Sequence, residues 1–373
     1  MRESIRKAER VIIKLGTRVL THDDGRLALS RLFSIVEAAS DCQRSGREVI
    51  IVSSGAVGLG RDALGLKQTP TELSERQACA AVGQSRLMGL YQEGFDQLGV
   101  PCGQVLLTQS DFDDRLRCLN LRATLLTLLR RGVVPVINEN DAVSTEELAF
   151  IEGEDRPVFG DNDKLSALVA AELGADVLVL LTDVEGIYDC DPRSNPGAVL
   201  LSTVQPDATI EAGGPLSAAS RGGMRSKLEA AQIAARSGCQ AVIASGRRIG
   251  ALSDVLAGHE TGSWFPAAGA LATRRRWIAF AAAPRGRLHL DPGAVAALTR
   301  RGASLLAAGV TAIEGDFGAG DVVVLTGPGG VDIGRGAVGC DAQTARLWCA
   351  GSPPVGIRNH HALVHRDHMV LQG

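Results

Sequence analysis

Residues 11–17 read Val-Ile-Ile-Lys-Leu-Gly-Thr, and the fold prediction starts from this stretch. A β-branched apolar run that ends at a Gly predicts a buried strand followed by a turn. Residues 27–45 then show helical apolar spacing and stop at Gly46, a typical helix end. A second apolar run, 49–52, ends at Ser53, and the stretch Ser53-Ser54-Gly55-Ala56 begins another helix. Strand, helix and strand in this order predict two parallel strands in one sheet.

The same alternation continues to about residue 245. It predicts further strands at 105–107, 133–137, 177–181 and 241–244, and helices at 72–98, 117–131, 165–173 and 222–237. The longest of these helices contains Gly83 and Gly89, where a break is expected. The fold class is therefore α/β, an open and mainly parallel sheet with helices on both faces. In such sheets ligands bind beyond the carboxyl ends of the strands.

The pattern changes near residue 274. Short strands are predicted at 277–280, 287–290, 322–325 and 363–370, with one helix at 294–301. This arrangement predicts a small, mostly β domain. The expected organisation is a large domain at 1–265, a linker at 266–276 and a small domain at 277–373.

Composition indicates the broad class of protein. The 373 residues are 45% apolar with a net charge of -3, which gives no general attraction to nucleic acid or membrane. The eight Cys form no CxxC pair, so a reducing, cytoplasmic location without disulfides is expected. The N-terminus is polar, and no apolar run approaches the ~20 residues that span a bilayer. No membrane association is expected.

Candidate chemical groups follow the predicted strands. Only five of the 39 basic residues are Lys, and two of them, Lys14 and Lys227, lie in Gly-containing turns. Gly160-Asp161-Asn162-Asp163 precedes the apolar run 165–173 and has more polar groups than one helix cap needs. The other polar turns at this edge are Ser53-Ser54, Asn138 to Asp141, and Thr182-Asp183. Their convergence at one sheet edge indicates a site more strongly than any single motif does.

This set of residues suits phosphoryl transfer. No GxxxxGK[ST], HExxH or GxSxG motif is present, and only His22 and His259 precede residue 274. Compact ammonium groups, backbone N–H groups and Mg²⁺ can neutralise a moving phosphoryl group. An acceptor that is already an anion, such as a carboxylate, needs no general base. The Asp residues can orient Lys groups, hold Mg²⁺ through water or bind a substrate ammonium. In the simpler alternative, Lys14 extends to solvent and Lys227 is an ordinary surface residue.

The motifs resemble those of the glutamate 5-kinase family, within the amino acid kinase superfamily. They are Ile13-Lys14-Leu15-Gly16-Thr17, Ser53-Ser54-Gly55-Ala56, Pro135-Val136-Ile137-Asn138-Glu139-Asn140-Asp141, Gly160-Asp161-Asn162-Asp163, Leu181-Thr182-Asp183, and Gly222-Gly223-Met224 with Lys227. The I-N-E-N-D and G-D-N-D motifs are the more specific ones. The C-terminal part, with Arg276-Trp277-Ile278, residues 302–306 and His365-Arg366-Asp367, is similar to a PUA domain.

The resemblance implies phosphorylation of L-glutamate by ATP to L-glutamyl 5-phosphate, the first step of proline biosynthesis. It implies that Lys14 and Lys227 flank the transferred phosphoryl group, with Asp161 and Asp163 organising them. Glutamate would contact Ser54, Asp141 and Asn162. ATP would contact Lys14, Thr182, Asp183, Arg221, Gly222, Gly223, Met224, Arg225, Ser226 and Lys227. Mg²⁺ is expected on the ATP phosphates, without metal ligands from the protein. Inhibition by proline and a homo-oligomer are also expected.

Three features depart from the family pattern. Arg221 stands where Thr is common, and could contact phosphate or crowd the nucleotide. Arg18 follows K-L-G-T where a small residue is expected. The loop 148–159 is acidic and long, which bears on loop closure and on the response to proline.

Two alternative functions are open. A sibling kinase would act on aspartate, N-acetylglutamate or UMP, but the G-D-N-D motif argues against it. An RNA-binding regulator would act through the C-terminal domain, where residues 274–373 carry 11 Arg against seven acidic residues. The domain has few aromatic residues for base stacking, namely Trp277, Phe280, Phe317 and Trp348. Salt-dependent RNA binding with and without residues 274–373 would test this alternative.

Overall fold

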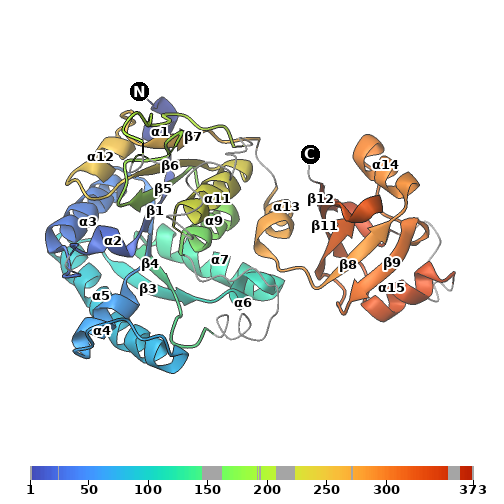
Figure 1. Cartoon of the computed structure of the whole chain (residues 1–373), viewed down its shortest axis with the longest axis horizontal. Coiled ribbons are helices and arrows are strands. Elements are labelled where there is room, and N and C mark those ends of the chain that lie inside the picture. Colours follow the sequence, from blue (N-terminus) through green and yellow to red (C-terminus); the bar gives the residue numbers. More distant parts are fainter. Residues whose placement is uncertain are drawn as a thin grey trace. The chain divides into compact units, whose positions relative to one another are not determined.

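The computed structural model describes residues 2–23, 25–144, 162–190, 192, 195–206, 223–269, 272–351 and 362–371. The chain divides into two compact units (Figure 1). The first contains residues 1–111 and 116–270, and the second contains residues 112–115 and 271–373. The domain limits at 265 and 277 stay a prediction.

The first unit contains a seven-stranded sheet in the order β3-β4-β2-β1-β5-β6-β7. The strands are β1 (Arg10–Leu15), β2 (Glu48–Ser53), β3 (Cys102–Leu107), β4 (Val134–Glu139), β5 (Val177–Thr182), β6 (Gln240–Ser245) and β7 (Ser263–Phe265). All neighbours pair in parallel except β7, which lies antiparallel to β6. The predicted α/β class is confirmed, and β7 is the strand that the sequence pattern missed. β1 lies in the centre, so the carboxyl ends of β2, β1 and β5 are adjacent.

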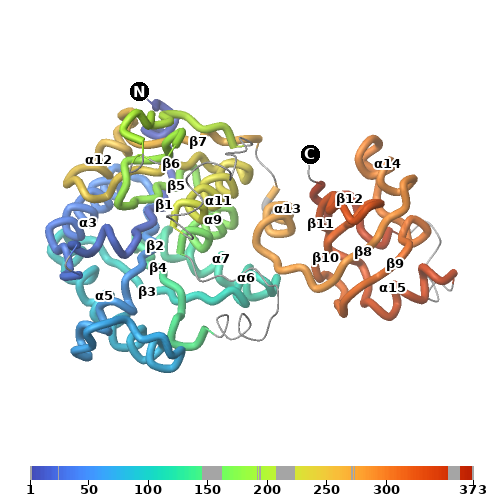
Figure 2. Tube along the Cα trace, in the orientation of Figure 1, coloured from blue at the N-terminus to red at the C-terminus, as the bar shows by residue number. Residues whose placement is uncertain are grey.

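Helices cover both faces of this sheet (Figure 2). The helices described between residues 3 and 256 are α1 (Glu3–Arg6), α2 (Thr17–Leu20), α3 (Leu29–Arg44), α4 (Ala56–Ala63), α5 (Leu73–Gln97), α6 (Ser110–Asp113), α7 (Arg115–Arg130), α9 (Asn162–Leu173), α11 (Gly223–Arg236) and α12 (Ala251–Leu256).

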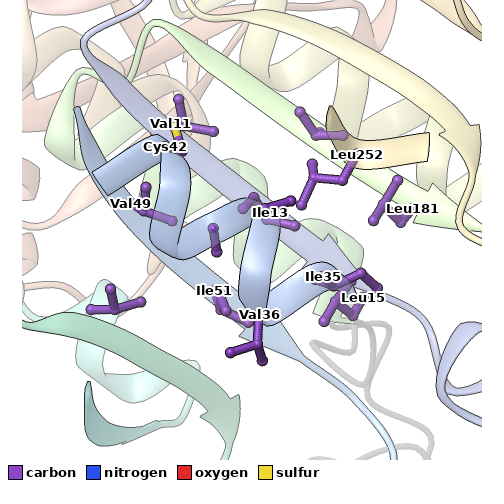
Figure 3. Close-up of a cluster of buried hydrophobic side chains, with 14 of the residues drawn as sticks. Val11, Ile13, Leu15, Ile35, Val36, Cys42, Val49, Ile51, Leu181 and Leu252 are labelled. Carbon is purple, nitrogen blue, oxygen red and sulfur yellow. The ribbon is translucent and has the colours of Figure 1, made fainter. Parts of the chain in front are cut away.

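Alternation along β1 decides where Lys14 points. Val11, Ile13 and Leu15 belong to a buried apolar cluster that also contains residues of α3 and α12 (Figure 3). Successive strand residues face opposite sides of a sheet. Lys14 therefore faces the side covered by α9 and α11, and the fully buried residues on either side of it hold its backbone in place.

Two details differ from the sequence prediction. The expected break near Gly83 or Gly89 is absent, because α5 runs as one helix from Leu73 to Gln97. The expected turn at Asn138 begins later, because β4 continues through Asn138 and Glu139 by pairing with β3. The side chains of Asn138 and Glu139 therefore extend from a strand of the sheet and not from a loop.

Gly60 and Gly83 allow α4 and α5 to cross in backbone contact. A Cβ atom at Gly83 would lie 1.7 Å from the carbonyl oxygen of Ala56, and one at Gly60 would lie 1.7 Å from that of Cys79. Backbone atoms cannot rotate away as a side chain can. This crossing holds the first turn of α4 in place, directly after Ser54.

Gly83→Ala is expected to destabilise the protein by about 1–3 kcal/mol, because the added methyl group must push α4 and α5 apart. Gly89→Ala in the same helix is the matched control, since nothing lies within 4 Å of a Cβ there. It should stabilise the protein by about 0.5–1 kcal/mol through its higher helix propensity. Urea unfolding of both variants measures the difference. Equal stabilities would contradict the close crossing.

The second unit contains a five-stranded sheet in the order β12-β11-β10-β8-β9. Its elements are α13 (Thr273–Arg276), β8 (Gly286–Leu290), α14 (Pro292–Arg301), β9 (Val310–Gly315), β10 (Val322–Thr326), β11 (Asp332–Val338), α15 (Ala342–Cys349) and β12 (Val364–Leu371). The predicted mostly β character is confirmed, but β9, β11 and α15 were not predicted.

The strand predicted at 277–280 is wrong. Residues 277–281 form a π-helical turn that continues directly from α13. Trp277 is buried in this conformation and its indole N–H donates a hydrogen bond of 2.8 Å to the carbonyl oxygen of Phe112. This contact between distant parts of the sequence decides the local structure.

The aromatic residues of the second unit belong mainly to its interior. Trp277, Phe317 and Trp348 are all buried, and the last two lie in the apolar core of this unit. Their faces are therefore not available for stacking with bases. In the part of the chain that the structure describes, no helix is both long and apolar enough to cross a membrane.

Candidate active site

The carboxyl ends of three central strands bring polar residues together. The backbone N–H of Gly16 donates to the carbonyl oxygen of Leu181 over 3.3 Å, and that of Ser54 donates to the carbonyl oxygen of Leu15 over 3.1 Å. The residue after β1 is thus hydrogen-bonded to the end of β5, and the residue after β2 to the end of β1. This edge is where an open parallel sheet binds ligands.

Asp163 lies between two lysines from distant parts of the sequence. Its Oδ1 is 2.6 Å from Nζ of Lys14 on β1. Its Oδ2 accepts a hydrogen bond of 2.9 Å from Nζ of Lys227 on α11. One carboxylate in the first turn of α9 therefore holds two ammonium groups close to each other.

These three groups are buried, with 3% of Lys14, 0% of Asp163 and 9% of Lys227 exposed. Burial acts to raise the pKa of Asp163, but the positive charges of Lys14 and Lys227 outweigh it and hold the pKa below its ordinary value. The carboxylate is therefore ionised at neutral pH. Two cations facing one anion leave a net positive charge, which suits an anionic ligand.

Further hydrogen bonds connect the first turns of α9 and α11. The hydroxyl of Ser226 donates to Oδ2 of Asp163 over 3.0 Å, and Nζ of Lys227 also donates to the carbonyl oxygen of Gly223 over 3.0 Å. Ser226 was predicted as an ATP contact, and in this structure it contacts Asp163. The ammonium group of Lys227 is consequently held by two acceptors, one on α9 and one on α11.

A second group of polar residues lies next to this cluster. Nδ2 of Asn162 donates to Oγ of Ser54 over 2.9 Å and to Oδ1 of Asn138 over 3.0 Å. Nδ2 of Asn138 in turn donates to Oε1 of Gln84 over 2.8 Å. The sequence prediction assigned Ser54 and Asn162 to glutamate binding and placed Asn138 in a polar turn at this edge, but it gave Asn138 no role and did not select Gln84. Asn138 could have been selected from the I-N-E-N-D motif, whereas Gln84 lies in mid-helix without a local signal.

Thr182 is the last residue of β5, and Asp183 begins the turn that follows. Oγ1 of Thr182 donates to Oδ1 of Asp183 over 3.1 Å, and Nη1 of Arg18 donates to Oδ2 over 3.1 Å. Burial acts to raise the pKa of Asp183, but these hydrogen bonds, that of Arg18 foremost, hold it below its ordinary value. The unusual Arg18 thus has a specific partner among the residues predicted to hold ATP.

The remaining predicted site residues are placed as follows. Asp141 lines a cavity of about 230 Å³ beside Gln84 and Glu139. Arg225 is exposed and pairs with Glu229 at 2.8 Å, and Gly223 and Met224 begin α11. Three predicted residues, Asp161, Arg221 and Gly222, lie outside the described residues, as does the loop 148–159.

No set of metal ligands is present in the described part of the chain, where no group of three His, Cys, Asp or Glu side chains could hold an ion. Asp163, the carboxylate between the lysines, is already paired with both.

Comparison with known proteins agrees with this fold. Residues 9–245 match the amino acid kinase family and residues 286–352 match the PUA domain. With the parallel sheet, these matches define an amino acid kinase that carries a PUA domain. The glutamate 5-kinase of Moorella thermoacetica is 42% identical, covering 100% of this chain and 98% of that protein. Those of Synechococcus elongatus and Geobacillus kaustophilus are both 44% identical over 98% of this chain, covering 100% and 97% of their own lengths. The chain belongs to the glutamate 5-kinase family.

Proposed function

We propose that this chain transfers the γ-phosphoryl group of ATP to the side-chain carboxylate of L-glutamate. The products are ADP and L-glutamyl 5-phosphate, and the reaction is the first step of proline biosynthesis. The observation that carries the proposal is the pair of buried ammonium groups, Lys14 and Lys227, on the single carboxylate of Asp163. Family membership supports glutamate as the acceptor.

The proposed chemistry needs positive charge but no general base. A carboxylate oxygen of glutamate attacks the γ-phosphorus, and the bond from that phosphorus to the β,γ-bridging oxygen breaks with its electrons moving to ADP. Negative charge spreads over the transferring oxygens, where Lys14 and Lys227 stabilise it. Asp163 orients both ammonium groups before ATP arrives, so little reorganisation is needed during transfer.

The two substrates are proposed to approach this cluster from different turns. Ser54, Asp141 and Asn162 hold glutamate. ATP lies over Thr182, Asp183 and the first turn of α11, where free backbone N–H groups and the helix dipole favour phosphate. The proposal that Arg221 and Gly222 also contact ATP rests on the sequence motif alone. Mg²⁺ is carried by the ATP phosphates, and its charge offsets theirs.

An acyl phosphate is the product that tests the proposal. Purified protein incubated with ATP, Mg²⁺, L-glutamate and hydroxylamine should form a hydroxamate. Omission of ATP, or chelation of Mg²⁺ with EDTA, should abolish the signal, and excess Mg²⁺ should restore it. A protein that hydrolyses ATP in this mixture without hydroxamate formation would contradict the proposed acceptor group. Activity that persists in EDTA would contradict the role of the metal.

Inhibition by proline and assembly into a homo-oligomer stay predictions. Proline added to the hydroxamate assay tests the first, and the mass of the protein in solution tests the second. RNA binding by the PUA domain also stays a prediction, which the salt-dependent assay described above tests.

A further inference from the structure

Four polar side chains form a continuous chain from α5 to the start of α9. Oε1 of Gln84 accepts a hydrogen bond of 2.8 Å from Nδ2 of Asn138. Oδ1 of Asn138 accepts one of 3.0 Å from Nδ2 of Asn162, which also donates to Ser54 over 2.9 Å. Gln84 is thus connected through Asn138 to a residue that directly precedes Asp163.

This chain has a direction, because an amide group has a donating and an accepting end. The oxygen of Gln84 can pair with Asn138 only through the NH₂ group of Asn138. The oxygen of Asn138 is then left to face Asn162 and fixes the NH₂ group of Asn162 in turn. With Oε1 of Gln84 facing Asn138, the hydrogen bonds hold both asparagine amides in this one orientation.

The chain ends at an acceptor without a partner. Oδ1 of Asn162 is buried, and no donor within the described residues hydrogen-bonds to it. A buried acceptor in this state costs free energy that a ligand donor would recover. The ligand group that fits is therefore a donor, such as an ammonium group.

The neighbouring cavity also favours a cation. Gln84 lines the cavity of about 230 Å³ together with the acidic residues Glu139 and Asp141. Neither Lys nor Arg is among its described lining residues. An ammonium group that enters this cavity beside Gln84 would therefore meet the acidic side chains of Glu139 and Asp141.

We propose that Gln84 is a positioning residue for the amino group of the acceptor substrate. It orients Asn138 and Asn162 so that Oδ1 of Asn162 accepts a hydrogen bond from the α-ammonium group of glutamate. The site thereby selects an amino acid over the same dicarboxylate without an amino group. This inference rests on the proposed glutamate kinase activity and adds a residue that selects the substrate.

The test compares L-glutamate with glutarate, which lacks only the amino group, in the hydroxamate assay. Gln84→Leu removes the acceptor of the chain, so KM for L-glutamate should rise about tenfold while KM for glutarate and KM for ATP stay unchanged. Gln84→Glu keeps an accepting oxygen and should retain a KM near that of the wild type. Gln92→Leu, at an exposed position of the same helix, controls for the substitution itself.

Several results would overturn the inference. One is an unchanged preference for L-glutamate over glutarate in Gln84→Leu. Another is a parallel loss for both acceptors and for ATP, which would show a structural role. If Gln84→Leu does not fold, Gln84→Met gives the same comparison with a side chain of similar length. Wild-type protein that forms no hydroxamate from any acceptor would refute the proposed function itself, a result distinct from the failure of Gln84 alone.

Discussion

Asp163→Asn should lower kcat by about 10²–10³-fold and destabilise the ligand-free protein by about 3–5 kcal/mol. The carboxylate forms ion pairs with Lys14 at 2.6 Å and with Lys227 at 2.9 Å, so an amide leaves two buried ammonium groups without their counter-charge. Stopped hydroxamate assays measure the first effect and urea unfolding measures the second. Saturating ATP should recover part of the lost stability, because its phosphates supply negative charge between the lysines.

Ser226→Ala is the matched control, because it removes only the hydroxyl that donates to Asp163 over 3.0 Å. Its effect on stability should stay near 1 kcal/mol. An Asp163→Asn protein that is as stable and as active as Ser226→Ala would show that the carboxylate does not organise the lysines.

The difference in stability between the wild type and Asp163→Asn should depend on pH. The pKa of Asp163 is lower in the folded than in the unfolded protein, so the stability that it contributes is present above the unfolded pKa, about 4. That stability is lost as the pH falls through the folded pKa. The free energy difference between wild type and Asp163→Asn should therefore be largest at neutral pH and shrink below about pH 4. A difference that grows in acid would contradict the ion-pair explanation.

Lys227→Ala should lower kcat by about 10²–10³-fold while KM for glutamate changes less than about threefold. The ammonium group is proposed to act on charge that develops on the phosphoryl group during transfer. Its removal therefore weakens the transition state more than it weakens bound glutamate. Steady-state kinetics with each substrate varied in turn separates the two effects.

Two variants sharpen this prediction. Arg236→Ala removes an exposed cation at the opposite end of the same helix, outside the proposed site, and should leave kcat unchanged. Lys227→Arg keeps the charge, but its planar guanidinium cannot reproduce both the bond to Asp163 and that to Gly223, so it should not restore activity. Equal proportional losses of kcat and of glutamate affinity in Lys227→Ala would contradict the proposed role.

The sequence predicts the large domain well where local patterns are strong. The β-branched runs of β1, β2 and β5 and the polar turns after them define both the sheet and its ligand-binding edge. β7 could not be predicted, because its three residues, Ser263–Phe265, are too short to show a period. The π-helical turn at 277–281 was mistaken for a strand because its apolar run has no clear period, and the distant carbonyl of Phe112 decides it.

The residues of the candidate site also differ in how far the sequence could predict them. Lys14, Asp163 and Lys227 were selected because each follows or opens an element at the sheet edge. Their contact with one another depends on folding, since 64 residues separate Asp163 from Lys227. Gln84 gave no signal, because it lies in the middle of α5 and its partner Asn138 is 54 residues away. Residues that position others are visible only in three dimensions.

Comparing L-glutamate with L-aspartate as acceptor tests the proposed function most directly. The measured quantity is kcat/KM for ATP-dependent hydroxamate formation with each amino acid, and with carbamate as a further acceptor. UMP forms no acyl phosphate, so its phosphorylation is measured by the release of ADP. L-Glutamate should be preferred over L-aspartate, one methylene shorter, by about tenfold or more. A clear preference for aspartate, carbamate or UMP would contradict the assignment of the glutamate side chain as the group that is phosphorylated.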